Sequence, residues 1–205
     1  MFRVGLTGGI ASGKSEVSRL LRALQVNVID HDVLARQAVA PGSAGLRRIA
    51  DHFGAQVLTK HGELDRTALA HLVFGNKDEL HVLNTIVHPE VKRLADENDQ
   101  AARDAGAAIV VHDIPLLVET QQEDTFDAVL VVEAPMAHRI ERMKQYRGMS
   151  EEEAQSRIAQ QASDEQRRTA ADFVIMNDGN LSDLETRVHD TWNKVLKRKT
   201  RQRSL

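Results

Sequence analysis

Four residues near the start of the chain have the types and spacing of a phosphate-binding loop. Gly8, Gly13, Lys14 and Ser15 fit the pattern G-x-x-x-x-G-K-[ST]. Polyphosphate needs many N–H donors close together, and only small residues let the backbone approach that closely. In such a loop the lysine, expected to be an exposed site charge, reaches the β- and γ-phosphates, and the serine binds Mg²⁺. The alternative is a glycine-rich turn before an ordinary helix.

The stretches on both sides favour the phosphate-loop interpretation. Residues 2–6 form a short, mostly apolar run that fits a buried strand. After the loop, apolar residues recur at helical spacing at Val17, Leu20, Leu21 and Leu24. Strand, loop and helix therefore follow in the order that places the positive end of the helix dipole at the phosphates.

Two acidic residues follow other predicted strands. Asp32 lies just after the strand at 26–29, and Asp113 follows the strand at 107–111. Open α/β sheets bind ligands at the carboxyl ends of their strands. Asp32 could therefore act at the site, cap the helix that begins near Val33, or do both. Asp113 could assist Mg²⁺ through water, or it could only turn the chain.

Apolar runs at 127–132 and 173–176 complete a set of five strands, which we expect to be parallel with helical crossovers. Residues 41–106 are mostly helical and form an insertion between strands, which we expect to face the substrate. A turn-rich break runs from 54 to 64, and Pro89 is expected to start a new helix, since proline fits the first helical turn.

Basic residues gather between the last two strands and again at the chain end. The first group contains Arg139, Arg142, Lys144, Arg147, Arg157, Arg167 and Arg168. Such runs are usually solvated faces, but a phosphoryl-transfer enzyme needs arginines that close over the transferring group. The tail at 197–205 is either a solvated helix end or a segment that binds an anionic surface. We expect it to be dispensable for catalysis.

Composition favours one cytoplasmic domain without nucleic acid, zinc or membrane partners. The sequence does not show the oligomeric state, and we favour a monomer. The 205 residues include no cysteine, and only 3% are aromatic, which argues against thiolate metal sites and a base-stacking surface. The sequence shows neither signal-peptide architecture nor an apolar run of membrane-spanning length.

Further motifs extend along nearly the whole chain. They are Gly5 to Ser15, Ile29-Asp30-His31-Asp32 with Ala35-Arg36, Leu64-Asp65-Arg66 with Val73-Phe74, Leu83-Asn84 with His88-Pro89, Ile114-Pro115-Leu116-Leu117 with Glu119, and Asn177-Asp178-Gly179. The ordered set resembles the dephospho-coenzyme A kinase family. This resemblance implies an α/β, three-layer P-loop NTPase fold with a five-stranded parallel sheet. It also implies a helical coenzyme-binding insertion at about 33–105 and a helical lid at about 139–168, within one domain spanning 1–205.

The resemblance also implies a reaction and its residues. Family members transfer the γ-phosphoryl group of ATP to the ribose 3′-hydroxyl of dephospho-coenzyme A, with Mg²⁺, in the last step of coenzyme A biosynthesis. Asp32 would accept the hydroxyl proton, and Lys14 and Arg142 would be the other catalytic residues. Substrate contacts would come from Asp32, Arg36, Leu116 and Leu117, and the metal would bind Ser15 and, through water, Asp113. ATP contacts would come from Gly8, Gly9, Ala11, Ser12, Gly13, Lys14, Ser15, Glu16, Arg142, Asn177 and Gly179.

Three positions depart from the family's pattern. His31 stands where a small residue is usual, Glu16 where a hydroxyl residue often follows, and Tyr146 where a lid arginine is expected. We hypothesise that Arg147 supplies the missing lid group. Gly148 is a helix terminator, and a chain that leaves the helix there frees Arg147 to turn toward the phosphates.

Two other functions fit parts of the sequence. A kinase for another small hydroxylated metabolite, such as a nucleoside or shikimate, shares the loop and lid but not the later motifs. A GTP-dependent switch needs the signature N-K-x-D, and Asn76-Lys77-Asp78-Glu79 is out of register for it. The D-x-x-G match at residues 51–54 ends a helix instead of following a strand. Dephospho-coenzyme A therefore remains the expected acceptor.

Overall fold

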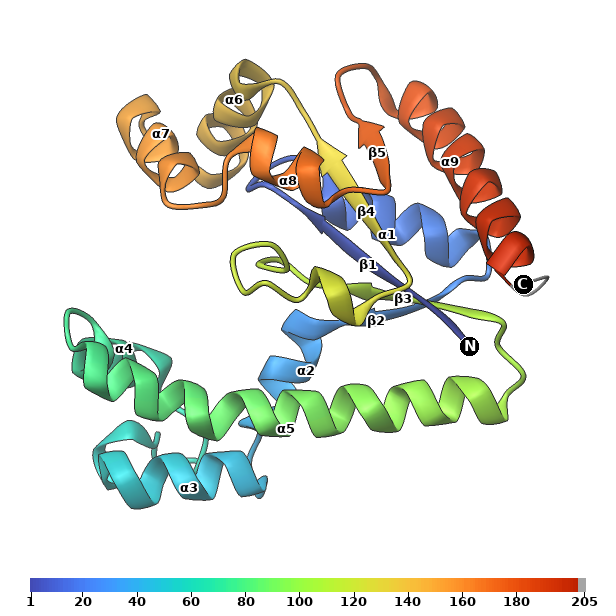
Figure 1. The fold of residues 1–205 in the computed structure, drawn as a ribbon. Coiled ribbons are helices and arrows are strands. Elements are labelled where there is room, and N and C mark those ends of the chain that lie inside the picture. Colours follow the sequence, from blue (N-terminus) through green and yellow to red (C-terminus); the bar gives the residue numbers. More distant parts are fainter. Residues whose placement is uncertain (203–205) are drawn as a thin grey trace. The chain divides into compact units, whose positions relative to one another are not determined.

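A computed structural model describes residues 1–202 of the chain, which form two compact units. The first contains residues 1–29 and the chain from 105 onward, and the second contains residues 30–104. A five-stranded sheet in the order β2-β3-β1-β4-β5 organises the first unit (Figure 1). Its strands are β1 (Phe2–Gly8), β2 (Asn27–Asp30), β3 (Ile109–Asp113), β4 (Ala128–Glu133) and β5 (Phe173–Met176).

Strand β1 lies at the centre of this sheet and is parallel to both of its neighbours, as the sequence predicts. Leu6 of β1 is in register with Asp113 of β3, and Gly8 is in register with Val132 of β4. The carboxyl ends of three adjacent strands therefore meet where the glycine loop begins, which is the edge at which open α/β sheets bind ligands.

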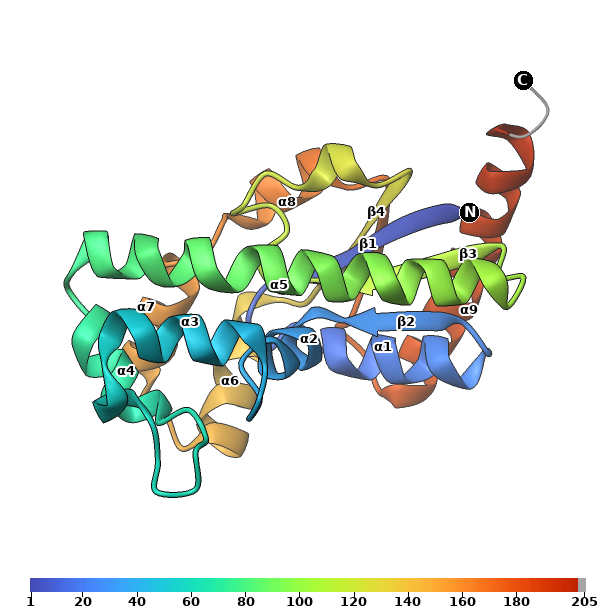
Figure 2. The ribbon, with the colours of Figure 1, turned by 90° about the horizontal axis from the view of Figure 1, so that it is seen from below.

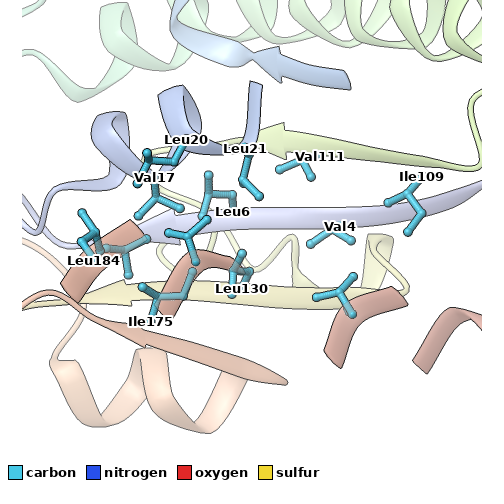
Figure 3. Close-up of a cluster of buried hydrophobic side chains, with 14 of the residues drawn as sticks. Val4, Leu6, Val17, Leu20, Leu21, Ile109, Val111, Leu130, Ile175 and Leu184 are labelled. Atoms are coloured by element: carbon cyan, nitrogen blue, oxygen red, sulfur yellow. The ribbon is translucent and has the colours of Figure 1, made fainter. Parts of the chain in front are cut away.

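Both faces of the sheet are covered, which explains why its strands are almost continuously apolar. Along β4, Leu130 and Val132 point into a cluster with residues of helices α1 and α9. Figure 3 shows strand residues such as Leu6 and Leu130 in contact range of Val17, Leu21 and Leu184 on this face. The alternate residues of β4, Val129 and Val131, pack on the other face with the segment after β3.

Two helices of the first unit begin with a capping box. The helices of this unit are α1 (Lys14–Ala23), α6 (Met136–Arg147), α7 (Glu151–Ala159), α8 (Asp164–Ala170) and α9 (Leu181–Gln202), with a short 3₁₀ turn, η2 (Glu123–Thr125). Ser150 and Glu153 form a capping box at α7, and Ser163 and Gln166 form another at α8. The region expected to be a lid thus contains three short helices, of which α7 and α8 have side-chain caps at their starts.

The second unit is helical and has its own apolar core. Its elements are α2 (His31–Ala38), α3 (Ala44–Phe53), the 3₁₀ turn η1 (Ala55–Val57), α4 (Arg66–Val73) and α5 (Lys77–Asp104). Helices α2 and α3 both lie along α5 in Figures 1 and 2. Ile49, Phe53, Leu69 and Ile86 are buried among them. The expected break after Gly54 is present as η1 and a bridge between Leu58 and Leu64.

The expectation that Pro89 starts a helix is wrong. Helix α5 runs without interruption over 28 residues with Pro89 in its interior, and Figure 2 shows it as one continuous helix. An interior proline removes one hydrogen bond and costs about 3 kcal/mol. The helix continues because Leu83, Ile86, Val87, Val91 and Leu94 pack into the same core on both sides of the proline.

The basic tail continues helix α9 instead of separating from it. Arg198 forms an ion pair with Asp172 (2.5 Å) and lies 5.8 Å from the centre of the Phe173 ring. Residues 203–205 of the predicted tail lie outside the described residues. None of the helices within residues 1–202 is long and apolar enough to cross a membrane.

Candidate active site

The glycine loop connects β1 to α1 and adopts a conformation that its sequence requires. Gly13 has φ +98°, and a Cβ atom added there would lie 2.0 Å from Nδ2 of Asn177. Position 13 therefore excludes every residue with a side chain, for conformational and for steric reasons. Ala11 has φ +59°, which is unusual for a residue that is not glycine.

Three consecutive carbonyl groups of the loop are held by side chains from distant parts of the chain. The bonds run from Arg139 Nε to Ile10 O (2.9 Å), from Arg142 Nη1 to Ala11 O (3.1 Å) and Ser12 O (3.3 Å), and from Asn177 Nδ2 to Ser12 O (2.8 Å). In a trans peptide the N–H points away from the C=O. Within residues 1–202, no hydrogen bond uses the N–H groups of Ala11, Gly13, Lys14 or Ser15. The loop thus keeps a set of donors for an anion at the N-terminus of α1.

Lys14 and Asp113 form an ion pair at the end of the central strands. Asp113 Oδ1 accepts a hydrogen bond from Lys14 Nζ, and its Oδ2 accepts one from Ser18 Oγ (2.5 Å). The side chain of Lys14 is only 15% exposed. The expectation of an exposed site charge is therefore wrong, because β3 supplies a buried counter-ion. Ser15, in contrast, is exposed in the first turn of α1.

Asp32 and Arg36 lie in the second unit, on α2, and both are exposed. The N-cap of α2 is Asp30, whose Oδ1 accepts from the N–H groups of Asp32 (2.9 Å) and Val33 (3.1 Å). The interpretation of Asp32 as the cap is therefore wrong, because strand β2 ends at Asp30 and the helix begins one residue later. Asp32 has no capping role that could explain its presence.

Arg142 links the glycine loop to the loop after β5, whose residues Asn177 and Gly179 the resemblance assigns to ATP binding. Its Nη2 donates to Asn177 O (3.2 Å), while Nη1 holds the glycine loop. Asn177 is itself buried, and its N–H donates to Glu133 O (2.7 Å). Next to it, Arg187 hydrogen-bonds to Asp178 and lowers the pKa of that carboxyl. The structure thus brings together three segments that the sequence predicts as parts of one ATP site.

Two buried arginines were not predicted as part of this arrangement. Arg139 is 2% exposed and pairs with Asp164 (3.0 Å); burial lowers its pKa, and Asp164 opposes that effect. Arg167 is 1% exposed and donates to Glu119 Oε1 (2.8 Å). Both arginines lie in a run of basic residues, which usually forms a solvated surface, so the sequence gave no indication that they are buried. Glu119, however, belonged to a motif of the resemblance.

Arg147 is the last residue of α6 and is exposed, beside Tyr146, which is 75% exposed. Gly148 follows in the left-handed conformation (φ +63°) and ends the helix, as expected. No hydrogen bond or ion pair among residues 1–202 involves the Arg147 side chain. The geometry therefore leaves Arg147 available, and its role stays a prediction.

The remaining predicted contacts differ in their accessibility. Glu16 is held by Arg19 (2.9 Å), whose hydrogen bond lowers the pKa of the Glu16 carboxyl and keeps it ionised. Leu116 is 46% exposed, whereas Leu117 is fully buried in the core beside β4. Of this pair, only Leu116 presents a side chain that a substrate can touch.

A glycine loop after the central strand of a parallel sheet, together with arginines from a following helical segment, defines a P-loop kinase. The model of one such family, dephospho-CoA kinase, matches residues 2–183. The chain belongs to this family.

Individual relatives agree with this assignment. A dephospho-CoA kinase of Thermobifida fusca is 46% identical over 198 residues, which cover 97% of this chain and 98% of that protein. Among solved structures, the protein TT1252 from Thermus thermophilus is similar with a TM-score of 0.82 and 36% identity, covering 94% of this chain and 97% of that one. The dephospho-CoA kinase from Campylobacter jejuni has a TM-score of 0.72 and 26% identity, covering 95% and 97%.

Proposed function

We propose that the protein phosphorylates the ribose 3′-hydroxyl of dephospho-coenzyme A with ATP, which gives coenzyme A and ADP. The family assignment supports the reaction and both substrates. One observation supports the ATP site above all. Distant side chains bind the carbonyl groups of the glycine loop, and its N–H groups at the start of α1 remain free. Such a cradle suits a polyphosphate chain, and phosphoryl transfer needs chiefly positioning and charge stabilisation.

In this reaction Asp32 accepts the proton of the 3′-hydroxyl while the hydroxyl oxygen forms a bond to the γ-phosphorus. The bond from that phosphorus to the bridging oxygen breaks, and ADP leaves with the electron pair. Lys14 and Arg142 stabilise the charge on the phosphate oxygens. The exposure of Asp32 and its freedom from capping support its assignment as the base.

Mg²⁺ fits the residues at the start of α1, and we include it in the proposal. The exposed hydroxyl of Ser15 would bind the ion directly. Both oxygens of Asp113 already accept hydrogen bonds from Lys14 and Ser18, so Asp113 suits contact through water better than direct ligation. When bound, the ion would neutralise charge that develops on the phosphate oxygens.

We also propose that the coenzyme binds residues of the helical unit from about 33 to 105, and that the segment from about 139 to 168 acts as a lid. The separate core of the helical unit supports the first assignment, and the arginines of α6 support the second. We propose a cytoplasmic monomer, for which gel filtration with light scattering is the test.

A coupled assay for ADP, with Mg-ATP and dephospho-coenzyme A, tests the function. We expect turnover with dephospho-coenzyme A and little with a panel of nucleosides or with shikimate. A well-folded preparation that releases no ADP with dephospho-coenzyme A would overturn the proposal. Faster turnover of a nucleoside would favour the alternative metabolite kinase.

A further inference from the structure

The peptide groups on both sides of Ile10 are held by side chains from the region after β4. The N–H of Ile10 donates to Oε1 of Gln161 (2.7 Å), and its carbonyl oxygen accepts from Nε of Arg139 (2.9 Å). Gln161 lies between α7 and α8, 151 residues further along the chain. A single residue of the phosphate loop is thus fixed at its donor and at its acceptor.

These two side chains are themselves held in place. Arg139 is almost fully buried and pairs with Asp164 (3.0 Å) at the start of α8. Glu119 accepts a hydrogen bond from the N–H of Ala162 (2.9 Å), the residue next to Gln161. The same oxygen of Glu119 accepts from Arg167. Ion pairs of two buried arginines, together with the hydrogen bond from Ala162, therefore fix the backbone from which Gln161 reaches the loop.

Arg139 also approaches the loop more closely than a side chain at position 9 would permit. A Cβ atom added to Gly9 would lie 2.5 Å from Nη2 of Arg139. That Nη2 atom is buried and has no hydrogen-bond partner among the described residues. A buried nitrogen without a hydrogen-bond partner lowers the stability of the fold. A role in positioning the loop therefore explains the buried Arg139 side chain better than a role in folding.

Holding Ile10 matters because the next residue has an unfavourable conformation. Ala11 has φ +59°, which residues other than glycine rarely adopt and which persists only when the surroundings fix it. The peptide that joins Ile10 to Ala11 carries the carbonyl held by Arg139 on one side and the free N–H of Ala11 on the other. Fixing this peptide directs one donor toward the place of the phosphates.

We propose that Gln161 and Arg139 are positioning residues for phosphate transfer, which set the orientation of the Ile10 peptide groups and so the donor set that receives ATP. The inference rests on the proposed kinase function. It differs from the role of Arg142, because neither Gln161 nor Arg139 is expected to touch the nucleotide. Gln161 is the better position to test, since it is half-buried while Arg139 belongs to the buried network.

The test compares Gln161→Leu with the matched control Gln160→Leu. Leucine keeps the size of the side chain but removes the acceptor, and Gln160 is an exposed neighbour at the end of α7. We expect Gln161→Leu to weaken ATP binding, measured by calorimetry, by about fivefold or more and to raise KM for ATP, with KM for dephospho-coenzyme A within about twofold of the parent. The control should leave all three values unchanged.

Two further readouts separate positioning from a general loss of structure. Adenosine has no phosphate, so its affinity, followed through the Gly179 amide resonance, should stay within about twofold in Gln161→Leu. The Ile10 amide resonance should move in Gln161→Leu and stay near its parental position in Gln161→Glu, which keeps the acceptor oxygen. If the leucine variant does not fold, Gln161→Ala provides the same readout, because alanine also lacks the acceptor oxygen.

An unmoved Ile10 resonance, unchanged ATP affinity, or equal losses for ATP and adenosine in Gln161→Leu would each overturn the inference. ATP binding and the Ile10 resonance need no acceptor substrate. Absence of turnover by the parent with dephospho-coenzyme A would therefore refute the proposed function, whereas normal turnover with an unmoved Ile10 resonance in Gln161→Leu would refute this inference alone.

Discussion

Lys14 donates a hydrogen bond to Asp113, so the lysine of the phosphate loop has a carboxylate partner at the end of the neighbouring strand β3. Asp113 is only 4% exposed and also accepts a hydrogen bond from Ser18. The register that places Asp113 beside Leu6 of β1 brings the carboxylate to the loop. Lys14 therefore contributes to the stability of the site as well as to the binding of phosphate.

We predict that Lys14→Ala removes measurable turnover and also lowers the melting temperature. The loss of turnover follows because a charge aimed at the transferring group is worth several kcal/mol. The loss of stability follows because a buried carboxylate that has lost its cation costs about 3–5 kcal/mol. Each kcal/mol lowers the melting temperature by about 2–4 °C in a chain of this size. The ADP assay and scanning calorimetry measure the two effects.

The double variant Lys14→Ala/Asp113→Asn separates these effects. Removing the unpaired charge should restore most of the melting temperature without restoring turnover. If Lys14→Ala keeps turnover within about threefold of the parent, the lysine does not act on the transferring phosphate.

The neighbouring acids Asp30 and Asp32 permit a sharper comparison, since the structure gives the capping role to Asp30. We predict that Asp32→Asn lowers kcat by roughly 10² to 10⁴, the usual range for loss of a general base, with ATP affinity little changed. Asp30→Asn is the matched control, because asparagine caps helices about as well as aspartate. Equal, small effects of both substitutions on kcat would remove Asp32 from the role of base.

The sequence predicts the elements of this fold well wherever local pattern decides them. The apolar runs locate all five strands to within a few residues, because strands covered on both faces need little else. Pro89 shows the limit. Its local preference is to begin a helix, but the core of the helical unit stabilises α5 across it, and that tertiary contribution has no local signature.

The candidate site, too, is predicted from local pattern only in part. The glycine loop is recognisable from its spacing, yet the side chains that hold it come from far along the chain. Arg139 is 129 residues from the carbonyl that it binds, and Gln161 is 151 residues from its N–H partner. A basic residue in a run of charges gives no indication that it is buried, so Arg139 and Arg167 could be identified only from the structure. Asp32 was a plausible cap from the sequence, and only the end of β2 at Asp30 shows that Asp30 takes this role.

The basic tail at residues 197–205 is predicted to be dispensable for catalysis, and the structure adds an expected effect on stability. Deleting residues 197–205 should leave kcat/KM unchanged, because Arg198 pairs with Asp172, which precedes β5 and so lies at the amino ends of the parallel strands, opposite the edge where the glycine loop begins. The deletion removes the half-exposed ion pair between Arg198 and Asp172, which is worth at most about 1 kcal/mol. A small drop in melting temperature is therefore expected. A large, salt-sensitive loss of kcat/KM would instead show that the tail steers the anionic substrate.

The lid arginines are the last test. Arg142 holds two carbonyls of the glycine loop and one of the loop after β5, so its removal should disturb the ATP site and the charge on the transferring group together. We predict that Arg142→Ala lowers kcat by at least about 10², since an arginine of this kind can be worth roughly 10³ or more. Arg168 is the control because, unlike the half-buried Arg142, it is exposed, and it pairs with Glu133 (2.7 Å). Arg168→Ala should change kcat by less than about threefold.

Arg147 has the position and the freedom to replace the arginine that is missing at Tyr146. It is the last residue of α6, and Gly148 in the left-handed conformation turns the chain immediately after it. An exposed arginine with only a surface role is worth less than about 1 kcal/mol, whereas a group that reaches the phosphates should matter more. We predict that Arg147→Ala lowers kcat at least about tenfold and that Tyr146→Arg restores part of this loss in the Arg147→Ala background. If Arg147→Ala is kinetically silent, the replacement hypothesis fails. Arg139 cannot then take over the role, because it is buried and already bound to Ile10 and Asp164.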